Sequence, residues 1–201
     1  MESDQSKYPY PFKTQPSEEI ARGWSESRVF KQEPGWILKV TYRGWRNSLK
    51  QLAENKSDYE FFKEKLGDYI PETQFVRGTD ERGRGVNIVR QKEIVGQTLA
   101  KYPHEKFEQN IEAQKNLVDL FNKLIKMWDV DGRIPDLVVF GGHPWNTPNI
   151  MIEDDTNKVY LVDTSASKRF QSKDAPFIYR KLSESVVKNM KVFVEKYKSK
   201  N

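Results

Sequence analysis

The sequence predicts an α+β protein whose first half is rich in β-strands and whose second half is mainly helical. From Ser25 to about residue 94, short β-branched and aromatic runs alternate with turn signals, with one helix among them. Beyond Gly96, apolar residues recur at helical spacing in two long stretches, and one short hairpin separates them. Two unlike halves within 201 residues indicate one domain of two lobes, with a cleft where the lobes meet.

Composition narrows the possible classes of protein. The chain has no cysteine and only two histidines, which excludes disulfides and zinc–thiolate sites and argues against a histidine metal cluster. It has no signal-peptide pattern and no apolar run that could span a bilayer, so we expect a soluble, cytoplasmic protein. The net charge of +5 permits attraction to nucleic acid, anionic lipid or nucleotide phosphates without selecting among them.

The first half is expected to contain two hairpins with a helix between them. Residues 1–18 are rich in proline and polar residues and predict a flexible arm. A helix is expected from about Asn47 to Leu66, ended by Gly67. Four β-rich runs are expected as strands: 27–32, 35–42, 72–79 and 86–94.

The second half is expected to contain two helices around one hairpin. Gly96 and Pro103 punctuate the chain, and the longest helix is expected from about His104 to Trp128, with Pro135 as its breaker. A last amphipathic helix is expected over about 175–197. The long helix carries one predicted apolar stripe: Ile111, Val118, Phe121, Leu124, Ile125 and Trp128.

The hairpin between these helices carries a polar residue at each end. Asn149 precedes the strand Ile150–Ile152, and Asp163 follows the strand Val159–Val162, so both are expected at the open end. Two oxygen-bearing side chains there could hold a hard cation such as Mg²⁺. An ordinary hairpin flanked by polar turn residues is the alternative.

This order of elements resembles the protein-kinase-like fold, above all the compact atypical kinases of the lipopolysaccharide-kinase and RIO type and the aminoglycoside phosphotransferases. The resemblance implies a small β-rich N-lobe over residues 19–95 and a helical C-lobe over residues 96–201. It also implies that the protein binds ATP with Mg²⁺.

In that family a Gly-rich loop covers the phosphates, and a hinge contacts adenine through backbone groups. Gly23 and Ser25 occupy the position of the loop, although Trp24 departs from the family pattern. Glu93 and Val95 occupy the position of the hinge.

The strand Trp36–Val40 carries the residue that corresponds to the family's phosphate-binding lysine. Lys39 stands between apolar neighbours, so its charge needs a partner. In the family a helix glutamate supplies that partner, and Glu60 is the best candidate, with Glu54 and Glu64 as alternatives.

Asn149 and Asp163 match the catalytic-loop asparagine and the magnesium-binding aspartate of the family. The expected catalytic aspartate, five positions before Asn149, is replaced by Pro144, which has no acid–base chemistry. His143 and Asp136 are the candidate bases, and Asn146 could only orient an acceptor.

These features predict a nucleotide-binding protein with two possible uses, and leave one alternative of another class. The first is an ATP-dependent phosphotransferase that acts on a protein or small-molecule hydroxyl. The second is a pseudokinase that serves as a scaffold or switch, which Pro144 favours. A basic nucleic-acid-binding module is the minor alternative, because the basic residues are dispersed and no binding motif is recognisable.

Overall fold

The computed structural model describes residues 18–22, 27–41, 47–79, 84–137, 147–164 and 172–198. By its internal contacts the chain divides into two compact units, Met1–Ser57 with Glu72–Glu93, and Asp58–Pro71 with Ile94–Asn201. The described elements are helices and two antiparallel sheets, which confirms the α+β class. The predicted kinase-like lobes, 19–95 and 96–201, stay a prediction.

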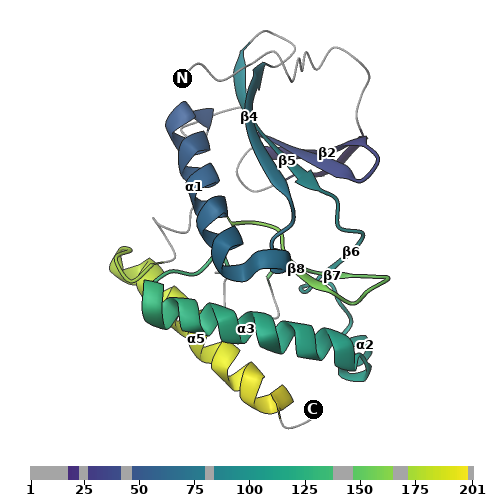
Figure 1. The fold of residues 1–201 in the computed structure, drawn as a ribbon, viewed down its shortest axis with the longest axis vertical. Coiled ribbons are helices and arrows are strands. Elements are labelled where there is room, and N and C mark those ends of the chain that lie inside the picture. The colour runs from purple at the N-terminus through teal and green to yellow at the C-terminus, as the bar shows by residue number, and fades with distance from the viewer. Residues whose placement is uncertain are drawn as a thin grey trace. The chain divides into compact units, whose positions relative to one another are not determined.

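One five-stranded antiparallel sheet forms the first unit (Figure 1). The two predicted hairpins are confirmed, and pairing of β3 with β5 joins them into the order β1-β2-β3-β5-β4. Gly35 turns the chain between β2 and β3 at a φ of +77°, which glycine adopts without steric cost. The strands are β1 (Glu18–Arg22), β2 (Ser27–Glu33), β3 (Trp36–Thr41), β4 (Thr73–Thr79) and β5 (Gly85–Lys92).

The side chains of β3 alternate between a buried face of this sheet and a half-buried face. Leu38 and Val40 are buried and belong to the apolar cluster of the unit, while Lys39 between them projects to the other face and is half-buried. The other buried members of the cluster are Phe30, Val86 and Ile88. The lysine therefore lies opposite the apolar core of its sheet.

Asn47 fastens the start of helix α1 (Leu49–Leu66) to this sheet. Its Nδ2 donates to the carbonyl oxygen of Gly85 (2.7 Å). Its Oδ1 accepts from the amide of Asn87 (2.7 Å) and from the guanidinium of Arg77 (2.8 Å). One side chain thus satisfies groups on both β4 and β5, which fixes where the helix begins.

The second unit contains two long helices packed side by side (Figure 1). These are α3 (Ile111–Asp131) and α5 (Phe177–Lys198), and the last part of α1 also belongs to this unit. The remaining elements are the 3-10 turn η3 (Gly67–Tyr69), α2 (His104–Gln109) and strands β6 (Gly96–Thr98), β7 (Ile150–Glu153) and β8 (Val159–Leu161), with sheet order β6-β7-β8. Across the described ranges, no helix has the length and apolar character needed to cross a bilayer.

The single helix predicted from His104 to Trp128 is wrong, because the chain breaks at Asn110. The Oδ1 of Asn110 accepts from the amide of Ala113 (3.0 Å), which caps the start of α3. Its Nδ2 also donates to the hydroxyl of Tyr102 (3.1 Å). Because the Asn110 side chain bonds a backbone amide three residues later, one helix ends and another begins there. The spacing of apolar residues in the sequence carries no information about such a hydrogen bond.

The predicted end and stripe of the long helix also need correction. The helix ends at Gly132, which has a φ of +68° and donates to the carbonyl oxygens of Met127 and Trp128, so Pro135 is not the breaker. Ile111 opens α3 and is 56% exposed, so it does not belong to the buried stripe. At 22 residues α5 is longer than α3, which has 21.

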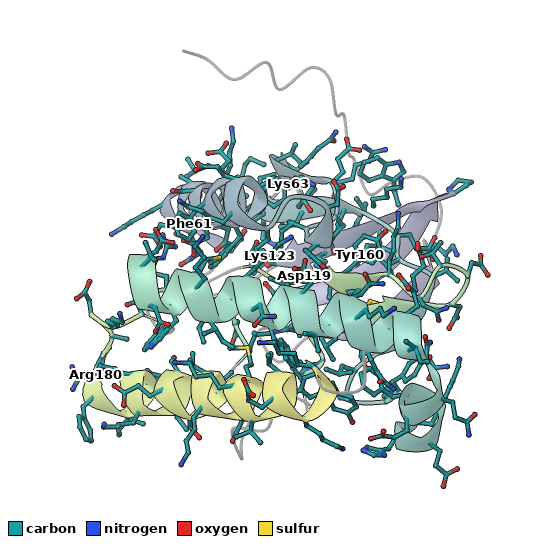
Figure 2. The ribbon with its side chains drawn as sticks, turned by 60° about the horizontal axis from the view of Figure 1, so that its bottom comes forward. Phe61, Lys63, Asp119, Lys123, Tyr160 and Arg180 are labelled. Atoms are coloured by element: carbon teal, nitrogen blue, oxygen red, sulfur yellow. The ribbon has the colours of Figure 1, made fainter. Side chains whose placement is uncertain are left out.

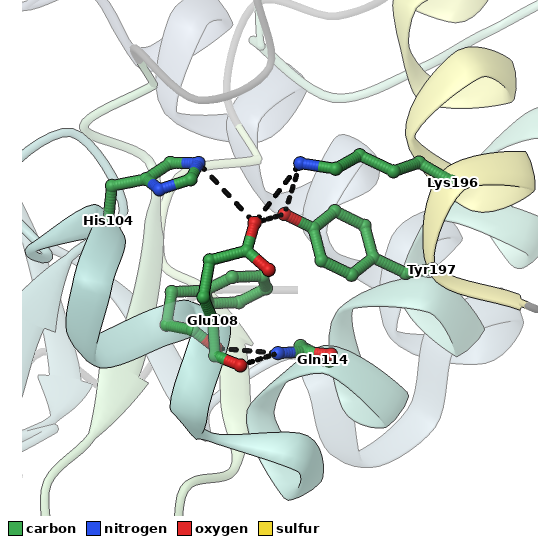
Figure 3. Close-up of polar contacts among 6 residues, drawn as sticks. His104, Glu108, Gln114, Lys196 and Tyr197 are labelled. Carbon is green, nitrogen blue, oxygen red and sulfur yellow. Dashed lines mark hydrogen bonds and ion pairs between the residues drawn. The ribbon is translucent and has the colours of Figure 1, made fainter. Parts of the chain in front are cut away.

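A polar cluster ties the end of α5 to α2 (Figure 3). The Oε1 of Glu108 accepts from the hydroxyl of Tyr197 (2.5 Å) and from Lys196 (3.1 Å), and His104 lies 3.6 Å away. Burial raises the pKa of Tyr197, and the hydrogen bond to Glu108 adds to this effect. The hydroxyl therefore stays protonated and holds the end of α5 in place.

Gly96 allows the close pairing of β6 with β7. It lies opposite Glu153, and a Cβ on it would stand 2.1 Å from the carbonyl oxygen of Ile152. No side chain other than hydrogen fits there without separating the strands.

Replacing Gly96 by alanine should therefore destabilise the protein by about 1–3 kcal/mol, the usual cost of overpacking. Urea unfolding followed by circular dichroism would measure the loss. Thr98→Ala, on the same strand, is the control and should cost less. Equal stability of Gly96→Ala and the unmodified protein would show that β6 does not depend on this close approach.

Candidate active site

The predicted hairpin with Asn149 and Asp163 at its open end is confirmed as a local structure. β7 and β8 pair antiparallel with Ile150 opposite Leu161, and the amide of Val162 donates to the carbonyl oxygen of Asn149 (2.8 Å). Asp163 follows Val162 directly, so the asparagine and the aspartate emerge from neighbouring strands. The hairpin therefore brings together the two residues predicted to bind metal.

A hydrogen bond joins this open end to Asp136. The Nδ2 of Asn149 donates to the main-chain oxygen of Asp136 (2.6 Å), although the two residues are thirteen positions apart. The amide of Asn149 in turn donates to the hydroxyl of Thr147 (3.2 Å), which is fully buried. Because the amide nitrogen of the Asn149 side chain faces a carbonyl oxygen, its own oxygen is directed elsewhere.

The segment that carries Asp136 is held by a buried ion pair three residues earlier. Arg133 contacts Asp58 on α1 at 2.5 Å, and the aspartate side chain is only 8% exposed. The guanidinium also lies over the ring of Phe61, 4.3 Å from its centroid. The Arg133 backbone also pairs with Ser172, five residues before α5 begins.

Sequence reasoning missed Asp58, although a signal was present. It selected Glu60 on the same helix, and the Glu60 side chain is exposed. Asp58 stands one helical turn before Phe62, which is fully buried, so both lie on the inward face of α1. An acidic residue at such a position needs a buried partner, and Arg133 is that partner.

The closed end of the hairpin is anchored to the helices and to β6. Asn157 has a φ of +56°; its Oδ1 accepts from Asn110 (2.6 Å), and its carbonyl oxygen accepts from Asn116 (3.2 Å). The amide of Asp154 donates to the carbonyl oxygen of Val95 (3.0 Å). Fixed at both ends, the hairpin is a rigid support for Asn149 and Asp163.

Two predicted hinge residues already use part of their backbone within the protein. The amide of Glu93 donates to the carbonyl oxygen of Gly35 (2.8 Å), and the Glu93 carboxylate pairs with Lys31 (2.8 Å). Val95 is 63% exposed, and its carbonyl oxygen accepts from Asp154. Binding of an adenine edge by Glu93 and Val95 stays a prediction.

The structure describes Lys39 but not all of the other predicted site residues. Lys39 lies on β3 with Val29 and Val89 on the flanking strands, and its pairing with Glu60 stays a prediction. Four candidate site residues lie outside the described residues, and their roles stay predictions: Gly23, Ser25, His143 and Asn146. Pro144, at the expected position of the catalytic aspartate, also lies outside them.

The donor set at the hairpin suits a hard cation. An aspartate and an asparagine oxygen are typical protein ligands for Mg²⁺, which takes one or two such groups and completes its shell with water and substrate phosphates. Within the described parts of the chain, no group of three or more histidine, aspartate or glutamate side chains could hold a metal ion. Binding of Mg²⁺ by Asn149 and Asp163, with a phosphate-bearing ligand completing the shell, stays a prediction.

Tyrosines and charged residues line the region between η3, α3 and β8 (Figure 2). The hydroxyl of Tyr69 donates to Asp119 (2.7 Å), which also pairs with Lys123 (2.9 Å). Burial acts to raise the pKa of Asp119, but hydrogen bonds from Lys123 and Tyr69 hold it below the usual value. Burial raises the pKa of Tyr160 on β8, and the nearby carboxylates of Glu153 and Asp68 add to this effect.

Comparison with known proteins gives little. No family model and no curated protein matches the chain. A high-resolution (2.2 Å) crystal structure of WbdD aligns with a TM-score of 0.47 and 16% sequence identity, over 90% of this chain and 38% of that chain. At this score the likeness is too distant to assign a fold, so the function proposed below rests on contacts within this chain.

Replacing Asp58 by asparagine should destabilise the protein by about 3–5 kcal/mol, because the Arg133 charge would stay buried without its counter-charge. Urea unfolding would measure the loss. Asp131→Asn is the control, because it removes the more exposed pair with Lys65 (3.8 Å) and should cost about 0–1 kcal/mol. Similar losses in the two variants would contradict a special role for the Arg133–Asp58 pair.

Tyr69→Phe should raise the pKa of Asp119, because the phenol no longer donates to the carboxylate. The lowered pKa of Asp119 stabilises the fold above the unfolded-state value near 4 and ceases to do so as the pH falls through the lower folded-state value. The stability difference between wild type and variant should thus shrink at acid pH. Carboxyl NMR titration would test this, and Tyr179→Phe should leave the Asp119 titration unchanged.

Proposed function

We propose that this protein binds a magnesium nucleotide in a kinase-like manner and transfers a phosphoryl group to a hydroxyl, with Asp136 as the catalytic base. The hydrogen bond from the Asn149 side chain to the main chain of Asp136 is the observation that carries the proposal. In the sequence Asp136 was only one of two candidate bases. The contact brings its residue beside the asparagine that precedes β7, although the two are thirteen positions apart.

Each residue at the open end of the hairpin has a distinct role in this proposal. Asp136 accepts the proton of the attacking hydroxyl, and a carboxylate is suited to that role. Asn149 and Asp163 present oxygen ligands from neighbouring strands, and a bound Mg²⁺ would neutralise charge on the phosphates. The hydrogen bond from Asn149 also fixes the place of the Asp136 main chain.

Phosphoryl transfer depends mainly on positioning and on charge stabilisation, so a divergent loop does not by itself exclude it. Asp136 supplies the carboxylate that Pro144 cannot supply at the usual position. The roles of Lys39 at the phosphates and of Glu93 and Val95 at the adenine stay predictions from the sequence. The acceptor is a hydroxyl of a protein or of a small molecule.

Asp136→Asn gives the sharpest test, because the contact to Asn149 uses the main-chain oxygen of residue 136 and survives the substitution. We expect Mg-ATP to raise the melting temperature of the wild type and of this variant alike, by linkage to the folded state. Turnover, measured as ATP consumption and phosphate transfer, should fall by about 10²–10⁴-fold in the variant. Asp163→Asn should instead lose the magnesium-dependent part of the thermal shift.

Two controls accompany this experiment. Asp174→Asn replaces an exposed carboxylate on another segment and should change neither binding nor turnover. His143→Ala tests the other candidate base, and a large loss of turnover there with none in Asp136→Asn would reject Asp136. Binding of Mg-ATP without transfer by the wild type would identify a pseudokinase, and no thermal shift at saturating Mg-ATP would reject the nucleotide site.

A further inference from the structure

Three consecutive large apolar side chains are exposed where α5 begins. Phe177, Ile178 and Tyr179 are 64%, 70% and 40% exposed, respectively. In Figure 2 the label of Arg180 marks this end of the helix. Nowhere else in the described parts of the chain are neighbouring large apolar residues exposed together. A contiguous exposed apolar surface marks a site of interaction with a protein, a membrane or a ligand more often than a polar surface does.

The end of α3 is tied to the segment that precedes α5. Lys173 joins the two helix ends, since its amide donates to the carbonyl oxygen of Gly132 (2.8 Å) and its Nζ to that of Asp129 (3.1 Å). We call Phe177, Ile178 and Tyr179 the apolar tip.

Basic side chains border the apolar tip. The guanidinium of Arg180 lies 5.7 Å from the centroid of the Phe177 ring, and the Nζ of Lys181 lies 5.8 Å from it. Glu184 pairs with both cations and offsets part of their charge. Along residues 172–184, three basic side chains, Lys173, Arg180 and Lys181, stand against two acidic ones, Asp174 and Glu184.

The arrangement of the tip decides which kind of partner fits. Successive residues of a helix project about 100° apart, so three in a row cover a wide arc. A protein partner that binds a helix contacts one stripe of it, at spacings of three and four residues. Apolar side chains that project from several sides of a helix end are suited to insertion into a fluid layer that can surround them.

We propose that the apolar tip inserts into the interface of a lipid bilayer that carries anionic headgroups. Phe177 and Ile178 enter the apolar boundary, and Arg180 and Lys181 stay at headgroup level and contact anionic lipid. Tyr179 suits the boundary itself, because its ring is apolar and its hydroxyl is polar. This attachment is peripheral and independent of the nucleotide chemistry proposed above.

Co-sedimentation of the full chain with vesicles tests the proposal. We expect the wild type to bind vesicles of phosphatidylcholine with phosphatidylglycerol and to bind pure phosphatidylcholine vesicles several-fold less. The double variant Phe177→Ser, Ile178→Ser should bind the mixed vesicles at least about tenfold more weakly, because it removes two apolar side chains from the tip. Val192→Ser is the matched control: Val192 is 62% exposed on the same helix, outside the tip, and this variant should bind like the wild type.

A second variant separates the contribution of charge. Arg180→Gln, Lys181→Gln should reduce binding to the mixed vesicles and remove much of its salt dependence. Melting curves of all variants by circular dichroism confirm that each one is folded. Three results would overturn the proposal: no binding of the wild type to mixed vesicles, equal loss in Val192→Ser, or self-association of the wild type that disappears in the double serine variant. The last result would assign the tip to a second copy of the chain.

Discussion

The buried ion pair between Arg133 and Asp58 is the contact on which the placement of the Asp136 segment depends. Arg133 stands just after the helix stop at Gly132, so its side chain fixes the first turn of the chain beyond α3. Both charges are largely removed from water, and each would be costly without the other. The stack on Phe61 adds an apolar contact to the same guanidinium. The segment therefore has one defined path from α3 toward Asp136.

The hairpin of β7 and β8 receives this segment at its open end. Asn149 reaches Asp136, and Asn110, Asn116 and β6 hold the rest of the hairpin. Asn110 serves two purposes, because one side chain both caps α3 and bonds the hairpin turn. Short polar side chains suit such junctions, since they reach neighbouring backbone groups without filling much space. The same residues that shape the fold thus set the geometry of the candidate active site.

This geometry changes how the missing catalytic aspartate is interpreted. By position alone, Pro144 argues for a protein that binds nucleotide without using it. The contact between Asn149 and Asp136 supports a different proposal, in which Asp136 supplies the carboxylate. The number of residues between two positions does not by itself determine whether their side chains meet in the folded protein, because connecting segments vary in length and path.

The sequence by itself determined the α+β class, the strands of the hairpins β2–β3 and β4–β5, and helices α1 and α5. Each of these follows from local periodicity and turn residues. It also placed Asn149 and Asp163 at one end of a hairpin, since register follows from the short turn between the strands. Only the tertiary structure decided the break at Asn110, the burial of Asp58 and the approach of Asp136 to Asn149. Each of these depends on a side chain that bonds a partner far along the chain or outside its own element, and local patterns carry no information about such partners.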